Sequence, residues 1–107
     1  MAMTRDATQR DVQANGITLR ITEQGEGPLV LLCHGWPELA YSWRHQMPVL
    51  ANAGYRVVAP DMRGYGGSSV PHDIQAYDIA QLVGDMVGLV GALGEQEACI
   101  VGHDWGA

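Results

Sequence analysis

The sequence predicts an α/β fold in which a mostly parallel sheet carries helices on both faces. The beginning of the chain has the pattern of a β-hairpin, and the remainder alternates strand-like apolar runs with helical stretches. Residues 29–33 form an apolar run without alternation, which is typical of a central parallel strand buried on both faces. With 107 residues and 47% hydrophobic side chains, the chain has enough apolar material for a core.

Composition and charge exclude several classes of protein. The 12 acidic and 6 basic side chains give a net charge of −6 without any basic cluster, so we expect no nucleic-acid binding. No apolar stretch reaches membrane-spanning length, and the N-terminus lacks the apolar core of a signal peptide. Cys33 and Cys99 lie in apolar runs without metal-ligand spacing. We therefore expect two reduced, buried thiols in a cytoplasmic protein.

The N-terminal part predicts a flexible tail followed by a hairpin. Residues 1–10 are polar and aperiodic, so we expect them to fray. Residues 11–14 and 17–23 have strand patterns and flank Asn15-Gly16, which is the strongest short sequence signal for a hairpin turn. Apolar and polar residues alternate in the second strand, so one of its faces should be exposed or half-covered.

A helix and a further strand follow the buried strand. The loop 34–38 leads into a helical stretch that contains Pro48, so we expect a break near Met47 and a restart with Pro48 in the first turn. Residues 55–60 then form a strand, and a glycine-rich loop covers residues 61–69. Both loops follow predicted parallel strands, at the edge where such sheets bind ligands.

A second helix is predicted to begin at Asp78, and residues 98–101 form the last strand. Gly84, Gly88 and Gly91 lie on one side of this helix, where we expect another element to approach closely. The opposite side carries an apolar stripe that should face the core, formed by Ile79, Leu82, Val83, Met86, Val90 and Leu93.

The residues after the last strand have the pattern of a sharp strand-to-helix turn. Small residues stand two positions before Asp104 and two and three positions after it, where a Cβ atom would clash in such a turn. Asp104 at the apex could cap a following helix, could be a solvated carboxylate, or could be a nucleophile. As a nucleophile it needs no base, because a carboxyl group with a pKa of about 3.9 is ionised at pH 7.

The loop that begins at His34 favours the nucleophile. In such an elbow, one oxyanion-hole N–H belongs to the residue after the nucleophile, here Trp105, and another to a loop after an earlier strand, here Trp36. Gly35 lets the backbone approach closely, and both loops follow a strand in the required order. Asp104 is thus the candidate catalytic residue, and the Trp36 and Trp105 N–H groups are the candidate oxyanion hole.

Four stretches together resemble the soluble epoxide hydrolases of the α/β-hydrolase fold, over roughly residues 11–107. They are His34-Gly35-Trp36-Pro37-Glu38, then Ser42-Trp43-Arg44 with Gln46 and Pro48, then Asp61-Met62-Arg63-Gly64-Tyr65-Gly66-Gly67-Ser68-Ser69, and Gly102-His103-Asp104-Trp105-Gly106-Ala107. The resemblance implies the N-terminal half of that fold, ending at the nucleophile elbow. The cap and the C-terminal part of the core are then absent from this sequence.

The same resemblance implies a two-step reaction without a cofactor or a metal. Asp104 would attack an epoxide carbon to form an alkyl-enzyme ester, and water activated by a His–acid pair would hydrolyse the ester to a vicinal diol. Trp36 and Trp105 would hold the oxyanion formed during hydrolysis. The catalytic His, its acid partner and the cap tyrosines come later in the family's sequences, so we expect this segment alone to be inactive. Its partners would be a small epoxide, water and the remainder of the domain. The resemblance leaves both a monomer and a homo-oligomer as alternatives.

Other polar residues of these loops are interpreted as structural. His34 and His103 stand one or two positions from an oxyanion-hole residue, so we expect their rings to pack beside the strand ends rather than to act as the base. Asp61 is expected to pair locally or to cap, and Arg63 is expected to pin its loop by hydrogen bonds. The glycine-rich loop 64–69 lacks a phosphate-binding motif.

Two other functions stay open. A dehalogenase of the same fold would use the same aspartate and the same ester, with the indole N–H of Trp105 holding the leaving halide. Haloalkane dehalogenases usually have a polar residue in place of Trp36, and haloacid-type relatives often have Arg in place of Trp105, so both positions favour the epoxide. A non-catalytic, hydrolase-like binding module would use Asp104 only as a helix cap.

Overall fold

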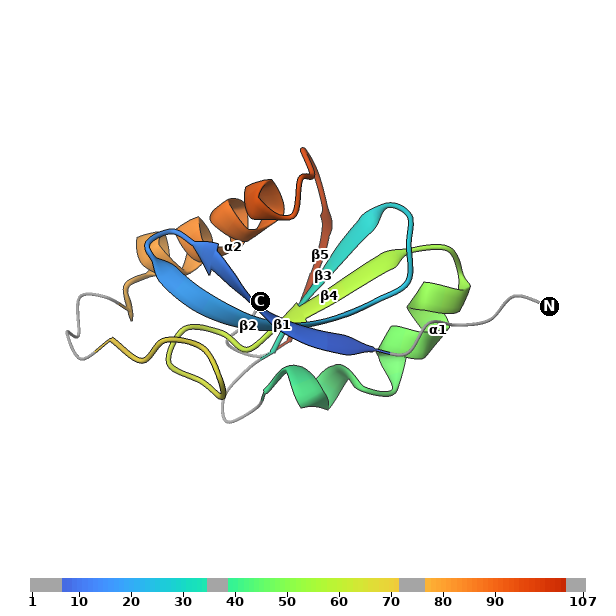
Figure 1. The fold of residues 1–107 in the computed structure, drawn as a ribbon, viewed down its shortest axis with the longest axis horizontal. Helices are drawn as coiled ribbons and strands as arrows, with labels where there is room; N and C mark the ends of the chain where they lie inside the picture. The colour runs from blue at the N-terminus through green and yellow to red at the C-terminus, as the bar shows by residue number, and fades with distance from the viewer. Residues whose placement is uncertain (1–6, 35–38, 72–76, 104–107) are drawn as a thin grey trace.

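The computed structural model describes residues 7–34, 39–71 and 77–103 of the chain. The described strands form one sheet in the order β1-β2-β4-β3-β5 (Figure 1). The β1–β2 and β2–β4 pairs are antiparallel, and β3 runs parallel to both of its neighbours, β4 and β5. In chain order the elements are β1 (Thr8–Ala14), β2 (Ile17–Gln24), β3 (Leu29–Cys33), the 3₁₀ helix η1 (Ala40–Trp43), α1 (Gln46–Asn52), β4 (Arg56–Pro60), α2 (Ile79–Ala92) and β5 (Cys99–Gly102).

The two α-helices cover opposite faces of this mixed sheet, as the sequence predicts (Figure 1). Alternate residues of β3 contribute to the two cores, and all five are buried, which confirms the strand predicted for residues 29–33. The core beneath α2 contains Val12, Ala14, Leu19, Ile21, Leu29, Leu31, Cys33, Val58, Met86, Leu89 and Leu93. The core beneath α1 contains Val30, Leu32, Ala40, Met47, Val57 and Ala59.

The hairpin between β1 and β2 has the predicted turn. Asn15 and Gly16 both have positive φ angles, 50° and 77°, as a type I′ turn requires. β1 begins at Thr8, so residues 8–10 pair with β2 although their polar sequence predicts a tail. The polar residues are tolerated there because β1 is an edge strand and these residues are exposed.

The first helical stretch is divided as predicted, but at an earlier position. A short 3₁₀ helix ends at Trp43 and α1 begins at Gln46, so the break lies at residues 44–45 instead of near Met47. Pro48 is the third residue of α1. Its missing N–H breaks no helical hydrogen bond there, because the first turn of a helix has no intrahelical acceptor for its N–H groups.

The apolar stripe predicted for α2 is only partly correct. Met86 and Leu93 are buried, whereas Ile79 and Val83 are 75% and 54% exposed. Leu89, which lies outside the predicted stripe, is fully buried instead. The helix is therefore rotated relative to the prediction, and one of its apolar sides faces away from the core.

The glycines of α2 explain this rotation. A Cβ atom at Gly84 would lie 2.9 Å from Asn15 Nδ2, and one at Gly88 would lie 3.2 Å from the Asn15 backbone nitrogen. These two glycines let α2 approach the hairpin turn, as predicted. For Gly91 the prediction is wrong among the described residues, because a Cβ atom added there would have no atom of another element within 4 Å.

The two cysteines lie in different environments. Cys33 is buried, as predicted, whereas Cys99 is exposed, so the prediction of a buried thiol is wrong for Cys99. All the residues of β5 are exposed, because in the described part of the chain β5 has β3 as a neighbour on one side only. Neither cysteine forms a disulfide.

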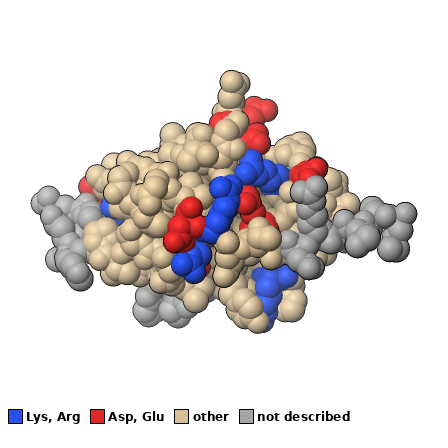
Figure 2. Space-filling model, in the orientation of Figure 1, with Lys and Arg blue, Asp and Glu red and all other residues tan. Residues whose placement is uncertain are grey.

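The surface carries interleaved charges. On the face shown in Figure 2, basic side chains lie beside acidic ones. Arg10 pairs with Glu23 at 2.7 Å, and Arg20 pairs with Asp11 at 2.5 Å. Burial opposes the ionisation of Glu23, but its hydrogen bonds and ion pairs with Arg10 and Arg56 are stronger and lower its pKa. Among the described residues, no helix has the length and apolar character needed to cross a membrane.

Candidate active site

The carboxyl ends of the three parallel strands meet at one edge of the sheet. β3 ends before His34, β4 ends before Asp61, and β5 ends before His103. β3 and β5 are in register at this edge, where Cys33 pairs with Gly102 and the His103 N–H donates to the Cys33 carbonyl at 3.2 Å. The chain therefore leaves the sheet from neighbouring positions at the edge where α/β sheets bind ligands.

The candidate catalytic residue Asp104 and the candidate oxyanion donors Trp36 and Trp105 lie outside the described residues. The segments that contain them are preceded by described residues, His34 in one case and His103 in the other. The described part of the site consists of these two residues and of the loop that follows β4.

The His34 side chain packs beside the strand ends, as predicted. His34 is 3% exposed, and its Nε2 atom accepts a hydrogen bond from the Met62 N–H at 2.9 Å. Its ring meets the Tyr65 ring edge-on, with 4.8 Å between the ring centroids. A ring nitrogen that accepts a backbone N–H is not available to take a proton from water. His103 is exposed, so the expectation of a packed ring is wrong there, because β5 lies at the edge of the described sheet.

Asp61 has the structural role that the sequence predicts. One carboxylate oxygen accepts a hydrogen bond from the Ala40 N–H at 2.9 Å, and the other accepts from the Gly67 N–H at 3.2 Å. Gly66 has a φ of 49°, and a Cβ atom at this position would overlap the Asp61 carboxylate. The glycine at position 66 therefore lets the loop close around the carboxylate.

The loop after β4 is fixed to β2 as well. Ser68 Oγ donates to the Asp61 carbonyl and accepts from the Arg20 N–H at 2.9 Å. The Asp61 N–H donates to the Arg20 carbonyl at 2.8 Å, and the Ser69 N–H donates to the Thr18 carbonyl at 2.9 Å. The loop thus provides hydrogen-bond partners for backbone groups in the part of β2 that β4 does not cover, since β4 pairs only with residues 21–24.

Arg63 pins the same loop to α2 through a buried ion pair. Its Nε and Nη2 atoms donate to the two carboxylate oxygens of Asp85 at 2.9 and 2.7 Å, and Asn15 Nδ2 donates to Asp85 at 3.0 Å. The side chains of Arg63 and Asp85 are only 4% and 1% exposed. The hydrogen bonds that Arg63 donates to Asp85 and the negative charge beside it raise the pKa of Arg63 above its ordinary value.

Asp85 is the buried partner of Arg63, and the sequence does not predict this pairing. It precedes Met86 and lies four residues before Leu89, so it falls on the face of α2 that is buried. A carboxylate on a core-facing position needs a cation, and the chain has only 6 basic residues. Because apolar residues occur all around α2, the sequence alone does not show that Asp85 faces the core, and its pairing with Arg63 could not be predicted.

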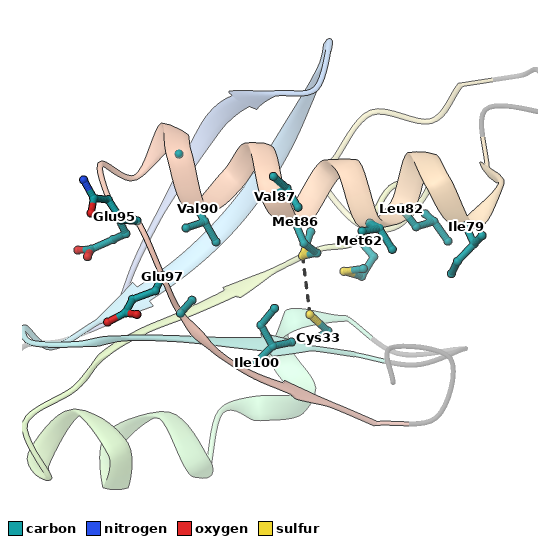
Figure 3. Close-up of a pocket in the computed structure, with 14 residues that line it drawn as sticks. Cys33, Met62, Ile79, Leu82, Met86, Val87, Val90, Glu95, Glu97 and Ile100 are labelled. Atoms are coloured by element: carbon teal, nitrogen blue, oxygen red, sulfur yellow. Dashed lines mark hydrogen bonds between the residues drawn. The ribbon is translucent and has the colours of Figure 1, made fainter.

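An apolar groove of about 530 Å³ lies between α2 and β5 (Figure 3). Ile79, Val83 and Val87 of α2 and Ile100 of β5 line it, and Glu95 lies at one end. Burial raises the pKa of the Cys33 thiol at its base, so Cys33 is not a thiolate nucleophile. Nowhere in the described part of the chain do three His, Cys, Asp or Glu side chains gather as a metal site would require.

Parallel strands, helices on both faces and polar loops at one edge define the α/β class of proteins, whose members bind ligands at the carboxyl ends of the strands. Residues 28–107 match the alpha/beta hydrolase fold, and the chain belongs to this family.

Several proteins named epoxide hydrolase are similar to this chain. Epoxide hydrolase A of Mycobacterium tuberculosis is 61% identical over 94% of the chain, and an epoxide hydrolase of Caballeronia sordidicola is 53% identical over 98%. The chain covers 32% and 33% of these two proteins, so it spans about a third of their length.

Solved structures agree with this similarity. A crystal structure of an epoxide hydrolase from Vigna radiata superimposes with a TM-score of 0.92 at 52% identity, over 94% of this chain and 31% of that one. A crystal structure of epoxide hydrolase A from Mycobacterium thermoresistibile also gives a TM-score of 0.92, at 56% identity, over 94% of this chain and 32% of that one.

Proposed function

We propose that the full-length protein is an epoxide hydrolase that opens an epoxide to a vicinal diol through an ester on Asp104. The observation that carries the proposal is the register of β3 and β5 at their carboxyl ends, in a chain 61% identical to a protein named epoxide hydrolase A. Because Cys33 pairs with Gly102, the segments that contain Trp36 and Asp104 begin at neighbouring points of the sheet edge. The segments that carry a nucleophile and its oxyanion donor need to leave the sheet from such neighbouring points.

In the first step, a carboxylate oxygen of Asp104 attacks an epoxide carbon and forms an ester. The carbon–oxygen bond of the ring breaks, and the released oxygen, which accepts hydrogen bonds from tyrosines of the cap, takes a proton from one of them. In the second step, water attacks the ester carbonyl carbon and gives a proton to the catalytic His. The Trp36 and Trp105 N–H groups stabilise the oxyanion, and losing one such donor typically costs about 3–4 kcal/mol. As the intermediate collapses, its hydroxyl proton passes to the alcohol oxygen that leaves, and the proton on the His returns to the deprotonated tyrosine. The diol leaves with an oxygen that came from Asp104, and the route uses neither a metal nor a cofactor.

The proposal assigns residues 11–107 to the N-terminal part of the catalytic domain. The cap, the catalytic His and its acid partner belong to the part of the protein that lies outside this sequence. The length of the similar proteins supports this division, since the chain covers about a third of each. We place the protein in the cytoplasm, where the two free cysteines Cys33 and Cys99 would stay reduced.

Purified full-length protein, assayed with an epoxide and with a haloalkane, tests the proposal. We expect diol formation without halide release, and we expect Asp104→Ala to abolish turnover because the ester cannot form. Asp78→Ala is the matched control, since it removes an aspartate that caps α2 far along the chain from the elbow. Halide release would establish the dehalogenase, and full activity of Asp104→Ala would refute the role of Asp104. Inactivity of the wild type towards both substrate classes would favour the non-catalytic binding module.

A further inference from the structure

The turn between β1 and β2 holds two groups that can react with each other, the Asn15 side-chain amide and the Gly16 backbone nitrogen. Both residues are exposed. Ala14 pairs with Ile17, so the Gly16 N–H lies in the turn, outside the β1–β2 ladder. A Cβ atom added at Gly16 would meet no other part of the described structure within 4 Å. The Gly16 nitrogen is therefore open to attack the neighbouring side chain.

We propose that Asn15 is a site of spontaneous deamidation and that the product weakens the contact between the hairpin turn and α2. The Gly16 nitrogen bonds to the Asn15 Cγ atom, and the side-chain nitrogen leaves as ammonia together with the proton of the Gly16 N–H. Water then opens the five-membered imide at one of its two carbonyl carbons and returns a proton to the Gly16 nitrogen. The products are aspartate and isoaspartate, in which the main chain runs through the former side chain.

The second asparagine of the chain, Asn52, is less suited to this reaction. It is the last residue of α1 and is followed by Ala53, whose Cβ atom hinders the approach of the backbone nitrogen. The Ala53 N–H also donates to the Val49 and Leu50 carbonyls, both at 3.1 Å. Asn52 is therefore an internal control for the reaction at Asn15.

The Asn15 side chain faces α2, so the reaction changes a contact within the fold. Its Nδ2 atom donates to Asp85 at 3.0 Å and to the carbonyl and Oε1 atoms of Gln81, both at 3.3 Å. The two hydrogen bonds to Gln81 are long and exposed to water. Local opening of the turn therefore releases the side chain for reaction without global unfolding.

Both products oppose this contact. Deamidation replaces a donor with a carboxylate, which only accepts hydrogen bonds when it is ionised. The new charge faces the carboxylate of Asp85, which already forms a buried ion pair with Arg63, and like charges repel. Isoaspartate also lengthens the main chain of a two-residue turn, whose length fixes the register of the hairpin.

Peptide mass mapping of the purified full-length protein tests the reaction. After incubation in mildly alkaline buffer, trypsin releases residues 11–20 and 45–56, each with one asparagine and one glutamine. We expect a gain of about 1 Da, located at Asn15 by fragmentation, at least about 10-fold faster than at Asn52. A sample digested without incubation corrects for deamidation during digestion. Equal rates at the two asparagines, or no gain at Asn15, would overturn the proposal.

Asn15→Asp in the full-length protein reproduces one product and tests its effect on the fold. We expect the equilibrium constant of folding, measured by urea denaturation, to decrease about 10- to 100-fold, as for a lost hydrogen bond to a charged group. Asn15→Gly removes the amide without adding charge, and Asn52→Asp adds the same charge on α1, so both should lose less. A loss in Asn15→Asp no greater than in these controls would refute the effect on α2.

The deamidated wild type provides a second measurement, because it folds before it reacts. Anion exchange separates it from unreacted protein by its additional negative charge. Its urea midpoint should lie below that of the unreacted fraction, and equal midpoints would likewise refute the effect on α2. Neither measurement depends on the proposed epoxide hydrolase function.

Discussion

Asp85 and Arg63 form the most deeply buried charged pair of the described residues. Both carboxylate oxygens accept from the guanidinium, and Asn15 donates a further hydrogen bond to Asp85. Such a pair contributes little net stability compared with apolar residues, but breaking it leaves a buried charge without its partner. Its contribution is therefore to hold the loop after β4, α2 and the hairpin turn in one arrangement.

Arg63→Met in the full-length protein should lower the free energy of unfolding by about 3–5 kcal/mol, because the buried Asp85 carboxyl group loses its ion-pair partner. Urea denaturation followed by circular dichroism measures the change. Arg44→Met is the matched control, since Arg44 is exposed and lies over the Tyr41 ring at 4.3 Å. The control should lose no more than about 1 kcal/mol. Equal losses in the two variants would contradict the account of the buried pair.

The sequence predicts the structural role of a single residue well where one chemical requirement dominates. Asp61 and Arg63 follow a strand in a glycine-rich loop, and both have the pinning roles expected of polar groups in such a loop. His103 is predicted as packed because it stands close to a candidate oxyanion-hole residue, and Cys99 is predicted as buried because it lies in an apolar run. Both are exposed, because their burial depends on which strands and helices flank β5 and not on their own neighbours in the sequence.

At the scale of the elements, the orientation of α2 depends on its contact with the hairpin turn. Gly84 faces the Asn15 amide, and that amide donates to Asp85 at 3.0 Å. A side chain at position 84 would have to displace the amide and break this hydrogen bond. The glycine thus allows both the approach of the helix and the hydrogen bond to its buried carboxylate.

Gly84→Ala should therefore destabilise the full-length protein by about 1–3 kcal/mol, the range for a lost hydrogen bond to a charged group, although alanine favours a helix. In an Asn15→Gly background, the same substitution should be neutral or stabilise by up to about 1 kcal/mol, because no amide remains to be displaced. Glycine also suits position 15, which has a φ of 50°. A double-mutant cycle by urea denaturation measures the coupling, and additive effects would contradict the contact.

Sequence patterns locate the elements more reliably than they orient them. The Asn15-Gly16 pair predicts the hairpin turn, and the alternation of apolar and polar residues in β2 predicts which face of this strand is buried. Both features are predictable because each depends on a few adjacent residues. The rotation of α2 is not predicted, since apolar residues occur all around the helix. Ile79 and Val83 are as apolar as Leu89, and only the contact with the hairpin decides that Leu89 is buried.

At the scale of the whole molecule, the position of the groove between α2 and β5 can be compared with the handedness of the crossover connections. The connection from β3 to β4 and the connection from β4 to β5 move in opposite directions across the sheet, so right-handed crossovers put α1 and α2 on opposite faces. A further crossover from β5, moving in the same direction as the last, would place its helix on the face of α2. We therefore expect an apolar helix from the rest of the full-length protein to cover the groove.

Val87 and Val49 provide a matched test of this expectation. They are 68% and 67% exposed in the described structure, but Val87 lines the groove and Val49 lies on α1. Valine and serine have similar helix propensities, so substitution reports mainly on burial. In the full-length protein, Val87→Ser should cost about 1–2 kcal/mol and Val49→Ser less than about 0.5 kcal/mol. Equal costs in urea denaturation would show that the groove is not covered.

The central claim is that Asp104 forms an ester with the substrate, and a single turnover of the full-length protein in ¹⁸O-water tests it most directly. Excess enzyme converts one equivalent of an epoxide, and mass spectrometry then maps the label in the peptide that contains Asp104 and in the diol. If water attacks the ester carbonyl, the label enters the Asp104 carboxylate and the first diol formed is unlabelled. Label in the diol alone, with an unlabelled Asp104, would show direct attack of water on the epoxide and would contradict the account.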